Sequence, residues 1–162
     1  RGVGLLGPDE HHARLDPLGH VGESVAERHQ HVGGGTADHA RAAATRAMLE
    51  SLWAPATLLP QMGATWTETG PETAEVRFAA MPDLPPMQVR LNADGDLVEV
   101  WALRWSDANP DKTYRLQPFG GRVLDWAEFQ GFRIPTRVEM GNHWGTPDYA
   151  PFFQATITAA EY

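Results

Sequence analysis

The stretch that decides the fold is MQVRLNADGDLVEVWA, residues 87–102. Apolar and polar residues alternate on both sides of Asp94-Gly95, a dipeptide that favours a two-residue hairpin turn. The register set by that turn places these residues opposite one another: Leu91 and Val98, Val89 and Val100, Met87 and Ala102, and Arg90 and Glu99. The first three pairs are apolar and the fourth is an ion pair, so hydrophobicity and charge both predict an antiparallel hairpin.

A second hairpin is predicted at residues 122–140, around Gln130-Gly131. The predicted pairs are Phe129 with Phe132, Ala127 with Ile134, Val123 with Val138, Glu128 with Arg133 and Arg122 with Glu139, with Trp126 beside Pro135. This register also places Asp125 opposite Thr136 on the otherwise apolar face. We expect that polar pair to be hydrogen-bonded structure rather than part of a carboxylate site.

Further strands are predicted around these hairpins, at residues 64–68, 73–79, 113–117 and 152–159. Pro118 and Gly120-Gly121 are expected to end the strand at 113–117, because proline cannot donate to a ladder and glycine weakens a strand interior. They also let the backbone bend before the second hairpin. A curved sheet is the expected result.

A helix is predicted at about residues 38–53, where strong helix formers are frequent. Thr36 or Asp38 can cap its start, and Pro55 ends it. Its apolar residues follow i, i+4 spacing, so one stripe should pack on the sheet. The predicted class is therefore α+β, a curved antiparallel sheet of about seven strands with one packed helix.

Composition excludes several classes of protein. The formal net charge is -8, with 21 acidic residues against 13 basic ones, so nucleic acid is not an expected partner. The absence of cysteine excludes disulfides and fits a reducing compartment, and we expect the protein to be cytoplasmic. No stretch of about 18 apolar residues is present, so no membrane span is expected.

The first third of the chain differs from the rest. All of the Trp, Phe and Tyr residues of the chain lie at or after Trp53, so the first third has none of them before that point. No apolar periodicity precedes residue 36. We expect residues 1–36 to be flexible or irregular and residues 37–162 to form a single α+β domain. The alternative, that residues 1–36 are read from a shifted frame of a GC-rich gene, stays open.

Histidines are concentrated in that same first third. These are His11, His12, His20, His29, His31 and His39. Imidazole is a common metal ligand, but no rigid element is predicted to hold these side chains in one geometry. We therefore expect no metal and no cofactor.

Several motifs in the folded part resemble a known family. They are LWAPATLLP (52–60), LRW (103–105), PFGG (118–121), GFRIPTRV (131–138), HWGT (143–146) and FFQATI (152–157). Together they are similar to the C-terminal half of a bacterial family of uncharacterised proteins, a domain of unknown function, over about residues 48–162. The resemblance implies no activity. The order of strands and hairpin is also faintly similar to bacterial lipoprotein-carrier half-barrels, which hold acyl chains.

The strand containing Trp101, Leu103 and Trp105 is apolar on both sides. Either the helix covers one side of this strand, or an apolar groove is exposed. We favour coverage by the helix, because its apolar stripe needs a partner.

The favoured hypothesis for function is non-enzymatic binding of an apolar small molecule or lipid by the curved sheet. Its candidate lining residues are Trp101, Trp105, Trp126 and Phe129. A first alternative is an incomplete β-domain that self-associates through an open sheet edge.

A second alternative is an enzyme of unknown class, which we consider less well supported. His143 is the only histidine after the predicted helix and would act as general base, with Asp148 or Glu139 orienting it. No nucleophile elbow, phosphate loop, dinucleotide fingerprint or zinc motif accompanies it.

Overall fold

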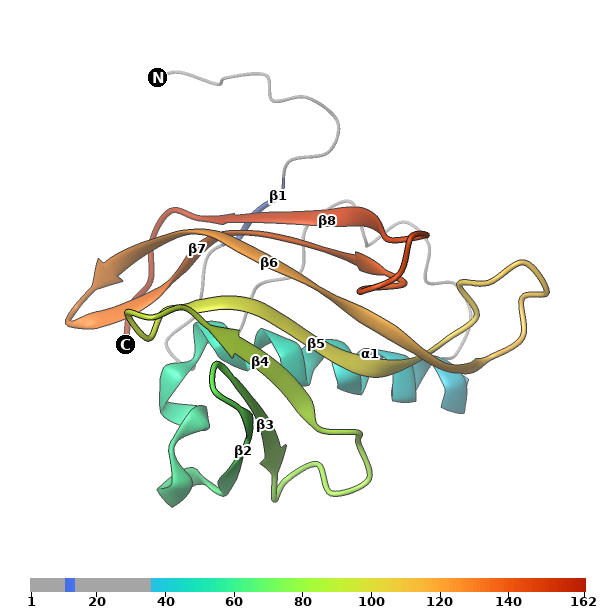
Figure 1. Cartoon of the computed structure of the whole chain (residues 1–162), viewed down its shortest axis with the longest axis horizontal. Coiled ribbons are helices and arrows are strands. Elements are labelled where there is room, and N and C mark those ends of the chain that lie inside the picture. The colour runs from blue at the N-terminus through green and yellow to red at the C-terminus, as the bar shows by residue number, and fades with distance from the viewer. Residues whose placement is uncertain (1–10, 14–35) are drawn as a thin grey trace.

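The computed structural model describes the backbone of residues 11–13 and all of residues 36–162. The helical segments are α1 (Ala37–Glu50) and the short 3-10 helices η2 (Ser51–Trp53), η3 (Pro55–Leu58) and η4 (Pro60–Met62). The strands are β1 (His11–Ala13), β2 (Ala64–Gly70), β3 (Thr73–Phe78), β4 (Met87–Leu91), β5 (Leu97–Ser106), β6 (Arg115–Phe129), β7 (Phe132–Asn142) and β8 (Ala150–Ile157). Figure 1 shows the sheet arching over α1.

The predicted helix is present. The Thr36 side chain caps it, because the His39 N–H donates to Thr36 Oγ1 at 3.2 Å. The α-helix ends at Glu50 and η2 continues it to Trp53, two residues before Pro55. The side chains that this segment buries are Thr45, Met48, Leu49, Ser51, Leu52 and Trp53.

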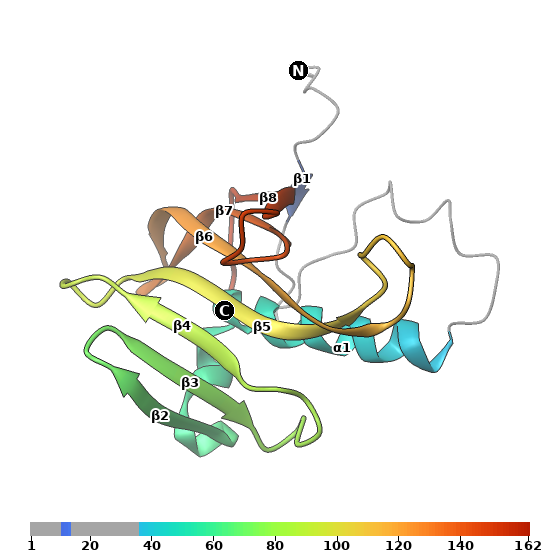
Figure 2. The ribbon, with the colours of Figure 1, turned by 45° about the vertical axis from the view of Figure 1, so that its right-hand side comes forward.

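Strands β2 to β8 form an antiparallel meander in which each strand pairs with the next along the chain (Figure 2). Strand β1 adds a parallel neighbour beyond β8. Helix α1 covers one side of the sheet, the concave face, and we call the other side the outer face. The core lies on the concave face and includes Val76, Met87, Val89, Val100, Ala102, Phe119 and Val138. The predicted α+β class is confirmed.

The β4–β5 hairpin has two of the predicted pairs, Val89 with Val100 and Arg90 with Glu99. Leu91 pairs with Leu97 instead of Val98, so the predicted two-residue turn is wrong. The register shifts between Arg90 and Leu91, next to the turn.

Asn92 accounts for the longer loop. Its Oδ1 accepts the N–H groups of Asp94 and Asp96 at 3.0 and 2.9 Å, which replaces ladder bonds with local ones. Gly95 follows with φ of 84°, a left-handed conformation that glycine adopts without strain.

The β6–β7 hairpin has the predicted register along most of its length. The predicted pairs that are present are Phe129–Phe132, Glu128–Arg133, Ala127–Ile134, Trp126–Pro135, Val123–Val138 and Arg122–Glu139. The predicted pairing of Asp125 with Thr136 is wrong, because the register shifts there and Asp125 pairs with Arg137. Asp125 is exposed and accepts the N–H of Trp126, whereas Thr136 is buried.

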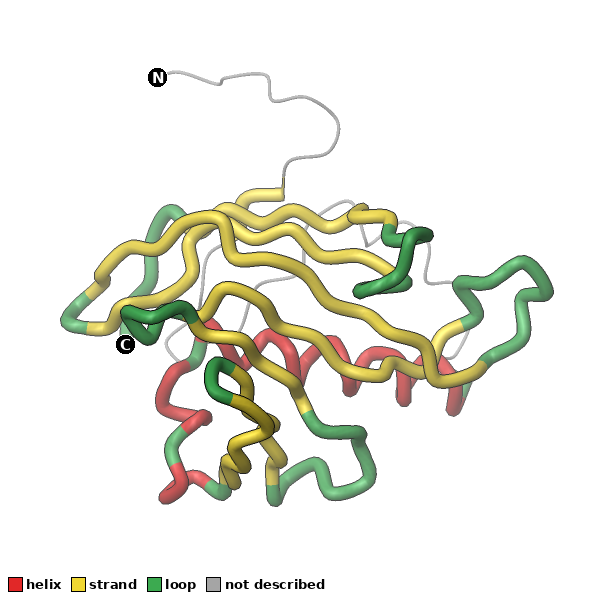
Figure 3. The backbone as a smooth tube through the Cα atoms, viewed as in Figure 1, coloured by secondary structure: helices red, strands yellow, loops and turns green. Residues whose placement is uncertain are grey.

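Strand β6 runs through Pro118 and Gly120-Gly121, where we predicted a break; Figure 3 shows it as one continuous strand. The Pro118 carbonyl accepts the His143 N–H at 2.8 Å, just past the end of β7. A Cβ on Gly121 would lie 1.8 Å from the carbonyl oxygen of Glu139. Glycine at this point therefore lets neighbouring strands approach closely without interrupting their pairing.

The predictions for residues 1–36 lie mostly outside the described residues. Within that range the structure describes β1, in which His11 pairs with Ala155 of β8. Among the described residues, no helix is both long enough and apolar enough to cross a membrane.

Candidate functional site

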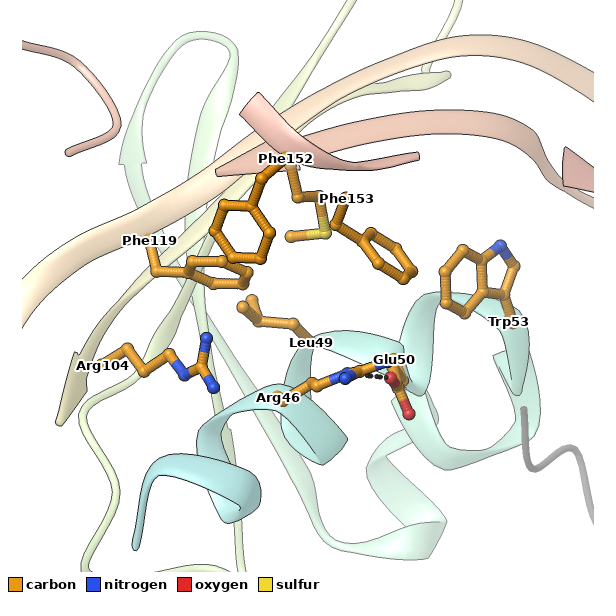
Figure 4. Close-up of a pocket in the computed structure, with 9 residues that line it drawn as sticks. Arg46, Leu49, Glu50, Trp53, Arg104, Phe119, Phe152 and Phe153 are labelled. Atoms are coloured by element: carbon orange, nitrogen blue, oxygen red, sulfur yellow. Dashed lines mark hydrogen bonds and ion pairs between the residues drawn. The ribbon is translucent and has the colours of Figure 1, made fainter. Parts of the chain in front are cut away.

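A cavity of about 260 Å³ lies between α1 and the concave face, and we call it the α1 cavity. Its apolar lining consists of Leu49, Trp53, Phe119, Met140, Phe152 and Phe153, and its polar lining of Arg46, Glu50 and Arg104. Figure 4 shows the three phenylalanine rings on one side and the two guanidinium groups on the other. The cavity is therefore apolar with charge along one side.

A bulge in β8 supplies two of these aromatic rings. Met140 pairs with Phe153 and Gly141 with Pro151, so Phe152 is an extra residue in the ladder. Successive side chains of a regular strand point to opposite faces, and a bulge redirects one of them. Phe152 thus also lines the cavity, where it remains 59% exposed and its ring centre lies 6.0 Å from that of Phe119.

Trp53 forms a firmly held wall. Only 1% of it is exposed, and its Nε1–H donates to the Pro135 carbonyl at 3.0 Å. The Trp53 carbonyl in turn accepts the Tyr162 hydroxyl at 3.0 Å. The segment after α1 is therefore tied to β7 and to the C-terminal residue, which holds this side of the cavity in place.

The charged groups of the cavity are unequally paired. Arg46 Nε lies 2.9 Å from Glu50 Oε1. Arg104 Nε donates to the Ala42 carbonyl at 3.2 Å, and its guanidinium lies 4.8 Å from the centre of the Phe119 ring. Burial lowers the pKa of Arg104 from its ordinary value, and the nearby charge of Arg46 lowers it further. An arginine nevertheless keeps its charge in a protein.

A second cavity, of about 400 Å³, lies beside η3 and is called the η3 cavity. Its lining includes Leu52, Leu58, Trp66, Val89, Trp126 and Pro135. Leu52 lines this cavity and Trp53 lines the α1 cavity, so the two adjoin at η2. The Trp126 Nε1–H is buried without a hydrogen-bond acceptor among the described residues.

The predicted lining residues do not lie together. Trp126 lines the η3 cavity, and Trp101 lies in a groove of the outer face. Trp105 donates to Asp38 Oδ1 at 2.6 Å near the start of α1, and Phe129 packs against the core. Helix α1 covers one side of β5, the side that carries Val100 and Ala102. On the opposite side Trp101 and Leu103 line the outer-face groove, and Leu103 is 45% exposed.

The residues of the enzyme hypothesis are not joined to one another. The His143 side chain has no hydrogen bond or ion pair to Asp148 or Glu139 within the described chain. Glu139 instead lies 3.8 Å from Arg122. His143 has φ of 61° in the turn after β7, where its carbonyl accepts the Thr146 N–H at 3.0 Å. The structure therefore gives His143 a place in a turn.

The histidines considered as metal ligands lie outside the described side chains, except His39. His39 lies on α1, with its ring centre 6.2 Å from that of Tyr114. Among residues 36–162, no group of three or more histidine, aspartate or glutamate side chains is placed to hold a metal ion.

Arg104, Phe119, Phe152 and Phe153 were not predicted as site residues. Arg104 carried a signal, because alternation along β5 places it on the same face as the apolar Val100 and Ala102. A charged residue in a core-facing row is uncommon and often functional. Phe152 and Phe153 both line the cavity because of the bulge in β8, and the sequence has no comparable signal for that bulge.

The fold and the cavity define a class of protein: a curved antiparallel meander whose concave face holds a helix and an apolar cavity. The model of a family of unknown function, DUF6544, matches residues 24–155, and the chain belongs to that family. Neither a curated protein nor a solved structure matches the chain. The similarity to lipoprotein-carrier half-barrels stays a prediction.

Proposed function

We propose that this protein binds an apolar or lipid-like small molecule in the α1 cavity. The observation that carries the proposal is a cavity of about 260 Å³ with six apolar side chains in its lining, one of them an exposed phenylalanine. Ligand sites are typically apolar concavities of about 300–1,000 Å³ with a few polar groups. The volume favours a short or medium acyl chain.

Phe152 leaves part of a large apolar ring in water. Phe152 is 59% exposed although it lines the cavity, with its ring centre 6.0 Å from that of Phe119. An apolar ligand would remove this ring from water, at about 25 cal/mol for each Å² of apolar surface buried. Occupation of the cavity would also restore the dispersion contacts that its lining lacks.

The test uses decanol as an uncharged probe and compares amide NMR spectra of the full chain with and without it. We expect shifts at Leu49, Phe119 and Phe153. Phe152→Ala should weaken binding several-fold, because it removes part of the apolar lining, while Phe132→Ala is the matched control. Phe132 is also an exposed phenylalanine on the sheet, but it packs on Tyr162 and not on the cavity.

Two results would contradict the proposal. One is a spectrum that does not change at saturating decanol. The other is a set of shifts confined to the outer face, around Trp101 and Leu103, because the ligand would then occupy the groove on that side.

Self-association through β2 is a second candidate function. Strand β2 is the last strand of the described sheet, and five of its residues in succession are exposed, from Thr65 to Thr69. An unpaired strand edge is a template for pairing with another chain. Sedimentation equilibrium should show a mass that rises with concentration, and a monomer mass at all concentrations would exclude this candidate.

A further inference from the structure

Among the described residues, the lining of the α1 cavity has more positive than negative side chains. Its lining has two arginines, Arg46 and Arg104, and one acid, Glu50. The formal net charge of the whole chain is -8, so a locally positive cavity is unlike the average surface of the protein. Electrostatics at this point would favour an anion.

Glu50 does not neutralise Arg104. The Glu50 carboxylate is bound to Arg46, at 2.9 Å between Oε1 and Nε. Among the described residues, no acidic side chain forms an ion pair with Arg104. Its hydrogen bond within the described chain runs from Nε to the Ala42 carbonyl, and neither terminal nitrogen has an acceptor among the described residues.

The surroundings of Arg104 would strengthen its interaction with an anion. One face of the guanidinium lies over the Phe119 ring, at 4.8 Å, and the side chain is half-buried. A partly desolvated guanidinium gains more from an anion than an exposed one does, because water screens the interaction less. The stacked ring and the bond to Ala42 also hold the fork in one orientation.

We propose that Arg104 is the head-group site of the α1 cavity, and that the ligand is an amphipathic anion with a carboxylate or phosphate head and an acyl or alkyl chain. This inference rests on the proposed function and adds the chemical class of the ligand. The planar fork of arginine donates two parallel hydrogen bonds to either head group. The chain then extends from the charged side of the cavity toward Leu49, Met140 and Phe153.

The experiment measures dissociation constants of the full chain for decanol, decanoate and decyl phosphate, which share a chain and differ in the head. We expect at least one anion to bind about tenfold to a hundredfold more tightly than decanol, as a charge-assisted hydrogen bond allows. The tighter of the two anions identifies the head group. Arg104→Gln should bring all three constants close together, and Arg104→Lys should retain part of the preference.

Arg77→Gln is the matched control, because Arg77 lies on β3, pairs with Glu75 at 3.2 Å and does not line the cavity. It should leave the preference for the anion unchanged. A variant that only disturbs the fold would weaken decanol and decanoate equally, so the ratio of the two constants separates loss of the head-group site from loss of structure.

The outcomes separate this inference from the proposed function. Equal binding of decanol and both anions to the unmodified chain would overturn the head-group site and leave the apolar cavity as a ligand site. Binding of none of the three would overturn both. A preference for the anion that survives Arg104→Gln would place the head group elsewhere and also overturn this inference.

Discussion

The two faces of the sheet differ in what holds them together. The concave face is packed by α1 and η2, with Val76, Val89 and Trp53 almost wholly removed from water. The outer face is covered by ion pairs and partly exposed apolar residues, among them the pair Arg90–Glu99 and the side chain of Leu103. The buried side chains that stabilise the fold and the candidate ligand site are therefore both on the concave face.

The largest expected effect is that of Trp53→Ala on the concave face. It removes a fully buried indole and its bond to the Pro135 carbonyl, so unfolding free energy should fall by about 3–5 kcal/mol. Urea denaturation measures it. Trp101→Ala on the outer face is the control and should cost clearly less, and equal losses would show that the two faces do not differ as described.

Gly121→Ala should be next, with a loss of about 3 kcal/mol. The added Cβ would lie 1.8 Å from the Glu139 carbonyl, and a backbone atom cannot move aside as a flexible side chain can. Gly95→Ala is the control, because nothing lies within 4 Å of its Cβ and only its φ of 84° is unfavourable, at about 1 kcal/mol. The same loss at both positions would argue against close approach of β6 and β7.

The outer face should show a small dependence on pH through Glu99. The Arg90 side chain donates to Glu99 at 2.6 Å and lowers the pKa of that carboxyl. A carboxyl whose pKa is lowered by folding stabilises the fold at pH values above the ordinary glutamate pKa. This contribution is lost as the pH falls through the folded-state pKa. The unfolding free energy of the unmodified chain should be about 0.5–1 kcal/mol higher than that of Glu99→Gln at neutral pH, and the two should be equal in strong acid.

That difference is measured by urea denaturation across the acid range. Glu75→Gln on the same face supplies the comparison, because Glu75 also pairs with an arginine, Arg77, at 3.2 Å. A difference between Glu99→Gln and the unmodified chain that grows as the pH falls would contradict the assigned sign.

The smallest effect is expected for Leu103→Ser. Leu103 is 45% exposed on the outer face, so its replacement should change the unfolding free energy by no more than about 0.5 kcal/mol. A loss of several kcal/mol would mean that something covers this face in solution. The same urea titration gives the answer.

The β6–β7 register could be predicted from the sequence and the β4–β5 turn could not, because the two turns are closed by different groups. At Gln130-Gly131 the backbone alone closes the turn, with positive φ at both positions. At Asn92 a side chain competes for the same N–H groups and lengthens the loop. Alternation of apolar residues carries no information about such local competition.

The candidate site was predicted less well than the fold. The sequence favoured Trp101, Trp105 and Trp126 as lining residues, whereas Trp53 is the tryptophan that lines the α1 cavity. Its other walls come from separate strands and from the bulge that turns Phe152 inward. Such a site depends on strand curvature and on one extra residue in a ladder, and neither follows from periodicity.

The sequential meander also bears on the order of folding. From β2 to β8 each strand pairs with its neighbour along the chain, so the loops that must close are short. The bonds from Trp53 to Pro135 and from Tyr162 to Trp53 instead join residues 82 and 109 positions apart. Local pairings are expected to form faster than such distant ones. We therefore expect the hairpins to assemble first and the helical segment to dock on them afterwards, which would make the α1 cavity one of the last parts of the molecule to take shape.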